Sequence, residues 1–68
     1  MKNEIIINYF KQRNDAKRLD AYEKYDTMNE ETLLNLIHEY NLSVEYNDIE
    51  FMNMLINVID YLFDCYNG

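Results

Sequence analysis

The clearest pattern in the chain is the run from Ile49 to Tyr66, in which polar side chains recur at alternating intervals of three and four residues. The polar positions are Glu50, Asn53, Asn57, Asp60 and Asp64, with Asn67 just beyond. This spacing follows the turn of an α-helix, on which the polar positions occupy a sector roughly 100° wide. Every other position in the run is apolar or aromatic. The pattern therefore predicts a helix that must be covered on two or three of its sides.

An ordinary amphipathic helix is indicated over residues 28–40. Its apolar stripe consists of Leu33, Leu36, Ile37 and Tyr40, with Leu34 flanking it. Thr27 followed by Glu30 fits a capping box at the start of this helix, and Asn41 is expected to end it.

The stretch NLSVEYN, residues 41–47, is interpreted as a short connector, extended over residues 44–46. Asn47 followed by Glu50 repeats the cap signal. We expect the C-terminal helix to begin there and to close at Asn67 and Gly68.

Residues 3–26 show a weaker helical pattern. A first apolar face is formed by Ile5, Ile6, Tyr9 and Phe10. Further along, Ala16, Leu19 and Tyr22 continue at three-residue spacing on a face that drifts away from the first. The pattern predicts two short helices or one bent helix, with a break near Asn14. EIIINYF also has strand propensity, but no second alternating run is long enough to pair with it.

The fold class follows from these helical patterns and from the turn residues. The chain has 68 residues, no proline, and a single glycine at its last position. An all-β protein with many tight turns needs more of both residues. We predict an all-α fold, a small three- or four-helix domain that spans residues 1–68.

Self-association is the favoured way to complete so small a core. A core of this size rarely supplies more than about 3–5 kcal/mol. Cys65 is the only cysteine and His38 the only histidine, so we predict no disulfide, metal site or cofactor. We expect a homodimeric helical bundle built on the C-terminal helix. The predicted interface residues are Met52, Leu55, Ile59, Leu62, Phe63 and Tyr66. Coverage of the same face by a different protein is the alternative.

Charge is distributed unevenly along the chain. The net charge is −7, all six basic residues lie within the first 24 positions, and the remaining residues include nine acidic ones. Because affinity for nucleic acid comes largely from Lys and Arg, we expect no direct nucleic-acid binding and instead a protein partner with a basic surface. The predicted partner-binding residues are Glu39, Glu45, Tyr46, Asp48, Glu50, Asp60 and Asp64.

Each of these acidic positions also has a plainer interpretation. The row of Glu50, Asp60 and Asp64 can imitate the phosphates of a nucleic acid, or it can be a solvated helix face. The basic stretch KQRNDAKR, residues 11–18, is expected to be a solvated face as well. Its alternative role is to pair with the acidic residues of the C-terminal helix, within the chain or across a dimer.

Several classes of function are disfavoured by what the sequence lacks. A single glycine precludes a phosphate-binding glycine loop, and the only serine, Ser43, lies in no nucleophile motif. We predict no catalytic residues and no enzymatic activity. No apolar run exceeds three residues, whereas a membrane span needs about 20. With a lone cysteine, the expected location is the cytoplasm.

We expect the protein to act by binding and inhibiting or regulating another protein. Its usage of ten Asn, seven Ile and seven Tyr is typical of AT-rich coding DNA. In size and composition the chain is similar in general character to phage-encoded inhibitors of host defence or nucleic-acid-processing proteins, anti-CRISPR proteins among them. Two alternatives stay open. One is an antitoxin-like or regulatory module that docks through its apolar C-terminal helix, and the other is a small oligomer that sequesters a nucleotide between tyrosines.

Overall fold

The computed structural model describes residues 2–24 and 30–67, with side chains through residue 65. Its helices are α1 (Glu4–Gln12), α2 (Ala16–Lys24), α3 (Glu30–Glu45) and α4 (Ile49–Asn67). No strand occurs in these described ranges. The predicted all-α class is therefore confirmed, as are the helix over EIIINYF and the break near Asn14.

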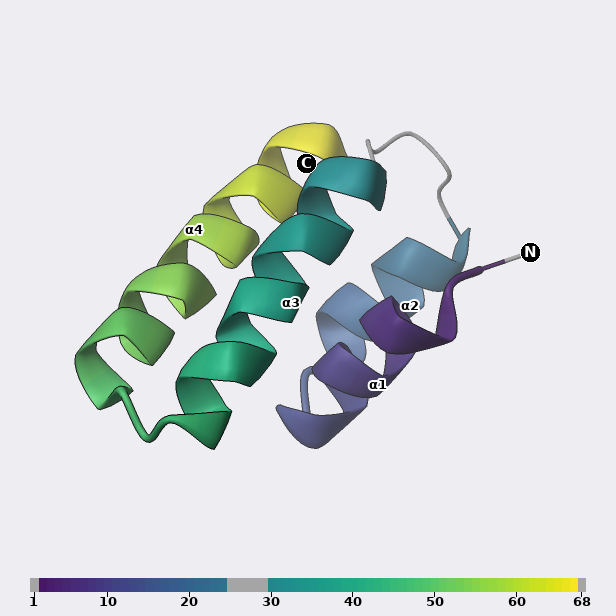
Figure 1. The fold of residues 1–68 in the computed structure, drawn as a ribbon. Coiled ribbons are helices and arrows are strands. Elements are labelled where there is room, and N and C mark those ends of the chain that lie inside the picture. The colour runs from purple at the N-terminus through teal and green to yellow at the C-terminus, as the bar shows by residue number, and fades with distance from the viewer. Residues whose placement is uncertain (1, 25–29, 68) are drawn as a thin grey trace.

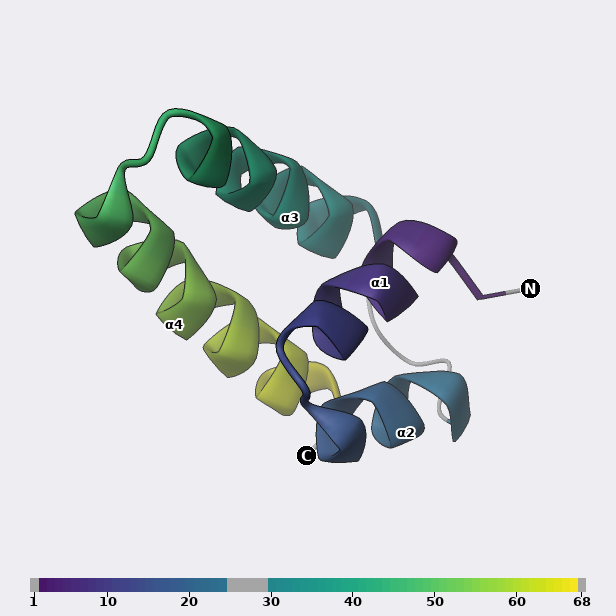
Figure 2. The same ribbon diagram turned by 90° about the horizontal axis from the view of Figure 1, so that it is seen from below.

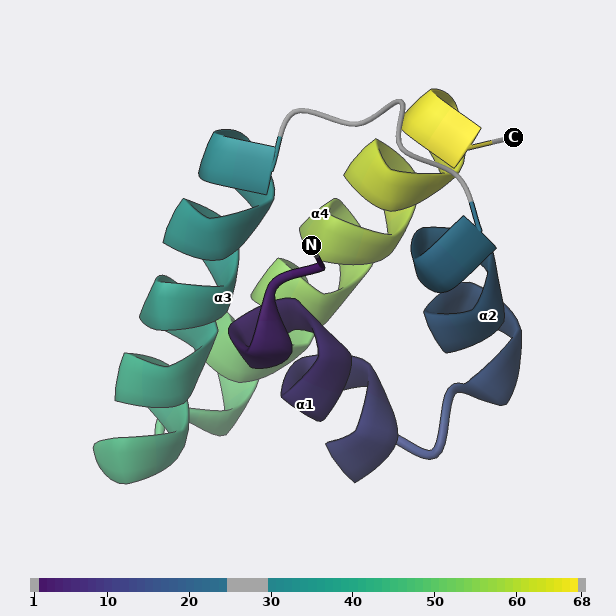
Figure 3. The same ribbon diagram turned by 90° about the vertical axis from the view of Figure 1, so that its right-hand side faces the viewer.

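The four helices form two helical hairpins. α3 and α4 run antiparallel (Figure 1); they lie close together at the turn that joins them and diverge toward the N-terminal end of α3 and the C-terminal end of α4 (Figure 3). α1 packs beside α3, and α2 folds back from α1 (Figure 3). α2 lies near the C-terminal end of α4, while the turn between α3 and α4 lies at the opposite end of that helix (Figure 2). The basic N-terminal hairpin thus borders only the C-terminal half of α4.

The same dipeptide, Asn-Asp, makes the turn in both hairpins. Asn14 and Asn47 each have φ of 57°, the left-handed conformation that follows many helix ends. In the first turn Asn14 N donates to Lys11 O at 3.1 Å and Asp15 N to Phe10 O at 3.0 Å. This pair of bonds is a Schellman motif, which satisfies carbonyl groups left free at the end of α1.

The second turn repeats this geometry. Asn47 N donates to Val44 O at 3.1 Å, and Asp48 N donates to Ser43 O at 2.8 Å. The aspartate of each dipeptide then caps the next helix. Asp15 Oδ1 accepts from Arg18 N at 3.1 Å, and Asp48 Oδ1 accepts from Phe51 N at 3.2 Å. In each turn, two backbone bonds therefore end one helix and one side-chain bond begins the next.

Two sequence predictions at this turn were wrong. Residues 41–45 belong to α3 and are not a connector, so Asn41 does not end the helix. The helix continues because Leu42 and Ser43 are covered beside α4, and this packing outweighs the modest helix propensity of asparagine. The cap of α4 is Asp48, not Asn47, because Asn47 already ends α3. Thr27 of the predicted capping box lies outside the described residues.

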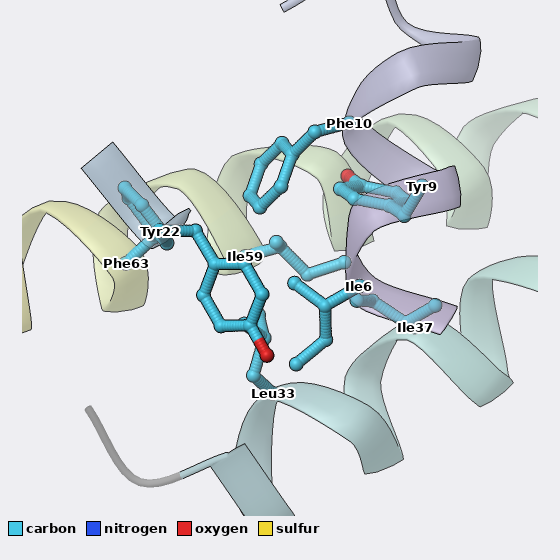
Figure 4. Packing of buried hydrophobic residues seen from close by; sticks show 8 residues of the cluster. All are labelled: Ile6, Tyr9, Phe10, Tyr22, Leu33, Ile37, Ile59 and Phe63. Carbon is cyan, nitrogen blue, oxygen red and sulfur yellow. The ribbon is translucent and has the colours of Figure 1, made fainter. Parts of the chain in front are cut away.

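The core draws residues from all four helices (Figure 4). Its members are Ile6, Tyr9, Phe10, Tyr22, Leu33, Ile37, Ile59 and Phe63. The rings of Phe10 and Phe63 meet edge to face at 5.1 Å, which ties α1 to α4. Tyr9 meets Tyr40 at 5.1 Å in the same manner and ties α1 to α3. The core therefore fixes one side of α4 against the other helices.

Candidate functional site

Two of the predicted partner-binding carboxylates are held by arginines of the same chain. Arg13 Nη1 donates to Asp60 Oδ1 at 2.6 Å, and its Nη2 donates to Asp60 Oδ2 at 2.9 Å. Arg18 Nε and Nη2 donate to Asp64 Oδ1 and Oδ2 at 3.2 and 2.9 Å. These are bidentate pairs, the strongest geometry available between these groups. A basic partner would have to displace an arginine to reach either aspartate.

Neighbouring groups hold both arginines in place. Tyr9 Oη accepts a bond of 2.9 Å from Arg13 Nη1, and the guanidinium lies 5.3 Å from the centre of the Tyr9 ring. Burial raises the pKa of Tyr9 to about 12, although the charge of Arg13 opposes the shift. Arg18 Nη1 also donates to Asp15 Oδ2 at 2.9 Å. Burial of Asp15 disfavours its charge, but the bonds from Arg18 outweigh burial and lower the pKa of that carboxyl.

The structure thus shows the alternative role of the basic stretch. We call the row of Glu50, Asn53, Asn57, Asp60 and Asp64 on α4 the polar ridge. Arg13 and Arg18 pair with Asp60 and Asp64 of the polar ridge and join the N-terminal hairpin to α4. Lys11 and Lys17 of the same stretch remain exposed.

The other predicted partner-binding residues gather at the end of the molecule where α3 turns into α4. We call this group the acidic corner: Glu39, Glu45, Tyr46, Asp48 and Glu50. All five are exposed, and the Tyr46 side chain retains 77% of its exposure. Within the described part of the chain, no ion pair involves any of the four carboxylates. The acidic corner is therefore a patch of negative charge that the chain itself leaves uncompensated.

A shallow hollow of about 240 Å³ lies in the acidic corner. It is lined by Glu39, Leu42, Ser43, Tyr46, Asp48 and Phe51. Ser43 is buried at its base, and the Ser43 hydroxyl donates to Tyr40 O at 2.7 Å. Two carboxylates and two aromatic rings consequently border an apolar floor. This combination suits the long side chain of a lysine or arginine, whose stem is apolar and whose head is cationic.

The predicted dimer-interface residues lie mostly on the inner side of α4. Leu55, Ile59 and Phe63 are only 4%, 0% and 2% exposed, because the chain's own helices cover them. Met52 and Leu62 are half-buried, and the side chain of Tyr66 is outside the described set. Leu55, Ile59 and Phe63 are thus already covered within the single chain.

A different face of α4 is apolar and exposed, and sequence reasoning missed it. We call it the outer stripe: Phe51, Met54, Val58, Tyr61 and Cys65. Each of these residues directly follows one of the polar positions in the sequence, so the outer stripe has the same alternating spacing as the polar ridge. That offset was a signal by which the outer stripe could have been separated from the inner apolar residues.

The described residues contain no group of three or more His, Cys, Asp or Glu side chains that could hold a metal ion. Among the described helices, none is long and apolar enough to cross a membrane. No protein-family profile, curated protein or solved structure matches this chain.

Proposed function

We propose that this protein binds another protein through the acidic corner and thereby inhibits or regulates it. The observation that supports the proposal is the exposed, uncompensated carboxylates around an aromatic hollow. These negative charges would speed the encounter with a partner that has a basic surface, and they would fix the orientation in which that partner binds. A lysine or arginine seated in the hollow would make the central contact.

The proposal extends to the kind of partner. Basic surfaces of this type occur on proteins that bind nucleic acid, and the carboxylates would occupy the place of phosphates there. An inhibitor of a host defence or nucleic-acid-processing protein, encoded by a phage or mobile element and acting in the cytoplasm, is the role we favour. Asp60 and Asp64 contribute less to this surface than the acidic corner does, because their arginines already neutralise them.

The test compares two variants of equal net charge. Glu39→Gln, Glu45→Gln and Glu50→Gln together remove three charges from the acidic corner. Glu4→Gln, Asp20→Asn and Glu23→Gln together remove three exposed charges from α1 and α2. Asp48 stays unchanged in both variants because it caps α4.

Immobilised wild-type protein is exposed to an extract of its source cells, and the captured protein is purified and titrated against each variant by calorimetry. We expect the corner variant to bind at least about tenfold more weakly, with the α1–α2 variant close to wild type. Equal losses in the two variants would reduce the effect to net charge and refute a role for the acidic corner.

A second candidate function is supported by the outer stripe. An antitoxin-like or regulatory module would dock on its cognate protein through exposed apolar residues such as Val58, which is 41% exposed. In that case Val58→Asp abolishes capture, whereas the corner variant binds normally. The two candidates therefore give opposite results with the same pair of variants.

A further inference from the structure

The outer stripe has the geometry of a helix-pairing seam. Its five residues are spaced by three, four, three and four positions, which is the a and d pattern of a coiled coil. Met54, Val58 and Tyr61 retain 50%, 41% and 74% of their exposure. From Phe51 to Cys65 the outer stripe runs about 21 Å along α4, or roughly four helical turns. A continuous apolar row of this length is uncommon on the surface of a monomer.

The opposite side of α4 is already buried within the single chain. Leu55, Ile59 and Phe63 follow one another at four-residue spacing and are buried, and Ile59 and Phe63 belong to the core cluster with residues of α1 and α3. The polar ridge separates these residues from the outer stripe on one side, where Arg13 and Arg18 approach. No described helix of the same chain covers the outer stripe.

We propose that a second copy of this chain packs against the outer stripe, with the two α4 helices antiparallel. Identical rows of apolar residues are self-complementary, as the interface of a two-fold dimer requires. Helices that pair through a and d positions interdigitate these side chains as knobs in holes. This dimer uses a face that the fold of the single chain leaves free.

Charge complementarity sets the direction of the two helices. The acidic corner lies at the N-terminal end of α4, and the basic α2 lies beside its C-terminal half (Figure 2). Antiparallel pairing brings α2 of each copy toward the N-terminal half of the other copy's α4. On α2, Arg18 pairs with Asp64 and Lys24 with Asp20, so the exposed Lys17 is the cation that no described ion pair engages. Glu50 then lies near α2 of the other copy, because Glu50 belongs to the polar ridge and α2 packs on that side of α4. Parallel pairing would instead place the two acidic corners together.

The dimer is independent of the proposed function. Phe51 belongs both to the outer stripe and to the hollow, so the hollow borders the dimer interface, but Glu39 and Glu45 lie on α3. Because Glu50 is also placed at the dimer contact, partner binding is measured separately with Glu39→Gln and Glu45→Gln alone, and loss of the dimer is measured with variants of the outer stripe.

Cysteine cross-linking tests both the dimer and its direction. Antiparallel pairing brings Cys65 of one copy near Phe51 or Met54 of the other. We expect Phe51→Cys, Met54→Cys or both to form a covalent dimer with Cys65 under mild oxidation, seen on a non-reducing gel. Within one chain position 54 lies about 16 Å from Cys65 along the helix, too far for a disulfide. Wild-type protein and Asn53→Cys, which places the thiol on the polar ridge, should remain uncross-linked.

Two outcomes would contradict the proposal, one for the direction of the helices and one for the dimer itself. Rapid cross-linking of wild-type Cys65, and of Met54→Cys in a Cys65→Ser background, would show a parallel pair and overturn the proposed direction. Light scattering at micromolar concentration should give twice the chain mass, and Val58→Asp should halve it without changing the circular dichroism spectrum. A monomer mass for the wild type across this range and at tenfold higher concentration would overturn the dimer.

Discussion

At the scale of single residues, the two Asn-Asp dipeptides decide where the helices end. Asparagine tolerates the left-handed conformation better than other residues with a Cβ, and aspartate is a strong cap for the next helix. The sequence indicated the break at Asn14, but it also suggested that Asn47 caps α4. Asparagine is equally suited to both roles, and only the positive φ of Asn47 distinguishes them. Backbone conformation of this kind cannot be deduced from residue type alone.

Replacement of asparagine by alanine should have opposite effects on stability at positions 47 and 53. Asn47→Ala should lower the free energy of unfolding by about 1 kcal/mol, because a Cβ without a polar group is disfavoured at φ of 57°. Asn53→Ala, on the exposed face of α4, should raise the free energy of unfolding by roughly 0.5 kcal/mol, since alanine is the better helix former. Urea denaturation monitored by circular dichroism measures both. Asn47→Gly should match or exceed wild type, and a loss there would contradict the conformational explanation.

At the scale of helices, the arrangement around α4 was predicted only in part. Its length and its need for cover on several sides followed from the distribution of apolar residues. Which apolar row faces inward did not follow, because Leu55 and Val58 are equally apolar in the sequence. The choice is made by α1 and α3, whose core residues pack with Ile59 and Phe63, and by the arginine pairs that fix the rotation of α4 about its axis. The sequence offered pairing of the basic stretch with the acidic residues of this helix only as an alternative, because residue type does not specify which arginine meets which carboxylate.

The bond between Arg13 and Asp60 should contribute measurably to the docking of the N-terminal hairpin. Their side chains are only 19% and 22% exposed, in contrast to 65% and 62% for the pair Lys24–Asp20. A double-mutant cycle with Arg13→Met and Asp60→Asn should give a coupling energy of about 1–3 kcal/mol in urea denaturation. The same cycle at Lys24 and Asp20 should give at most about 0.5 kcal/mol. Equal coupling in the two cycles would mean that the Arg13 pair is no more than a surface contact.

At the scale of the whole molecule, charge is segregated along the chain and in space. The basic residues of α1 and α2 neutralise the polar ridge at one end of α4, while no ion pair among the described residues involves the acidic corner at the other end. The uneven charge along the chain is evident from the sequence, and Glu39, Glu45 and Tyr46, which it predicts to bind a partner, are exposed. The sequence could not show that Asp60 and Asp64 are neutralised, since that depends on the fold.

Segregated negative charge should make the protein more stable as salt is added. At a net charge of −7, repulsion acts over distances longer than the Debye length of about 10 Å at 0.1 M salt, whereas the bidentate arginine pairs are short and partly shielded from solvent. We therefore expect the melting temperature to rise between 10 mM and 300 mM sodium chloride, on the order of 3 °C. A fall would show that attraction between the paired charges outweighs the repulsion.

The acidic corner should account for most of that response. Glu45 ends α3, at the negative pole of the helix dipole, and Glu39 also lies on this uncompensated surface. Glu39→Gln with Glu45→Gln should raise the melting temperature at low salt and reduce its further rise with salt. Asp20→Asn with Glu23→Gln removes the same charge, but it also breaks the bond from Lys24 to Asp20 and should stabilise less. If the two variants responded alike, the repulsion would belong to the net charge of the molecule and not to its unequal distribution.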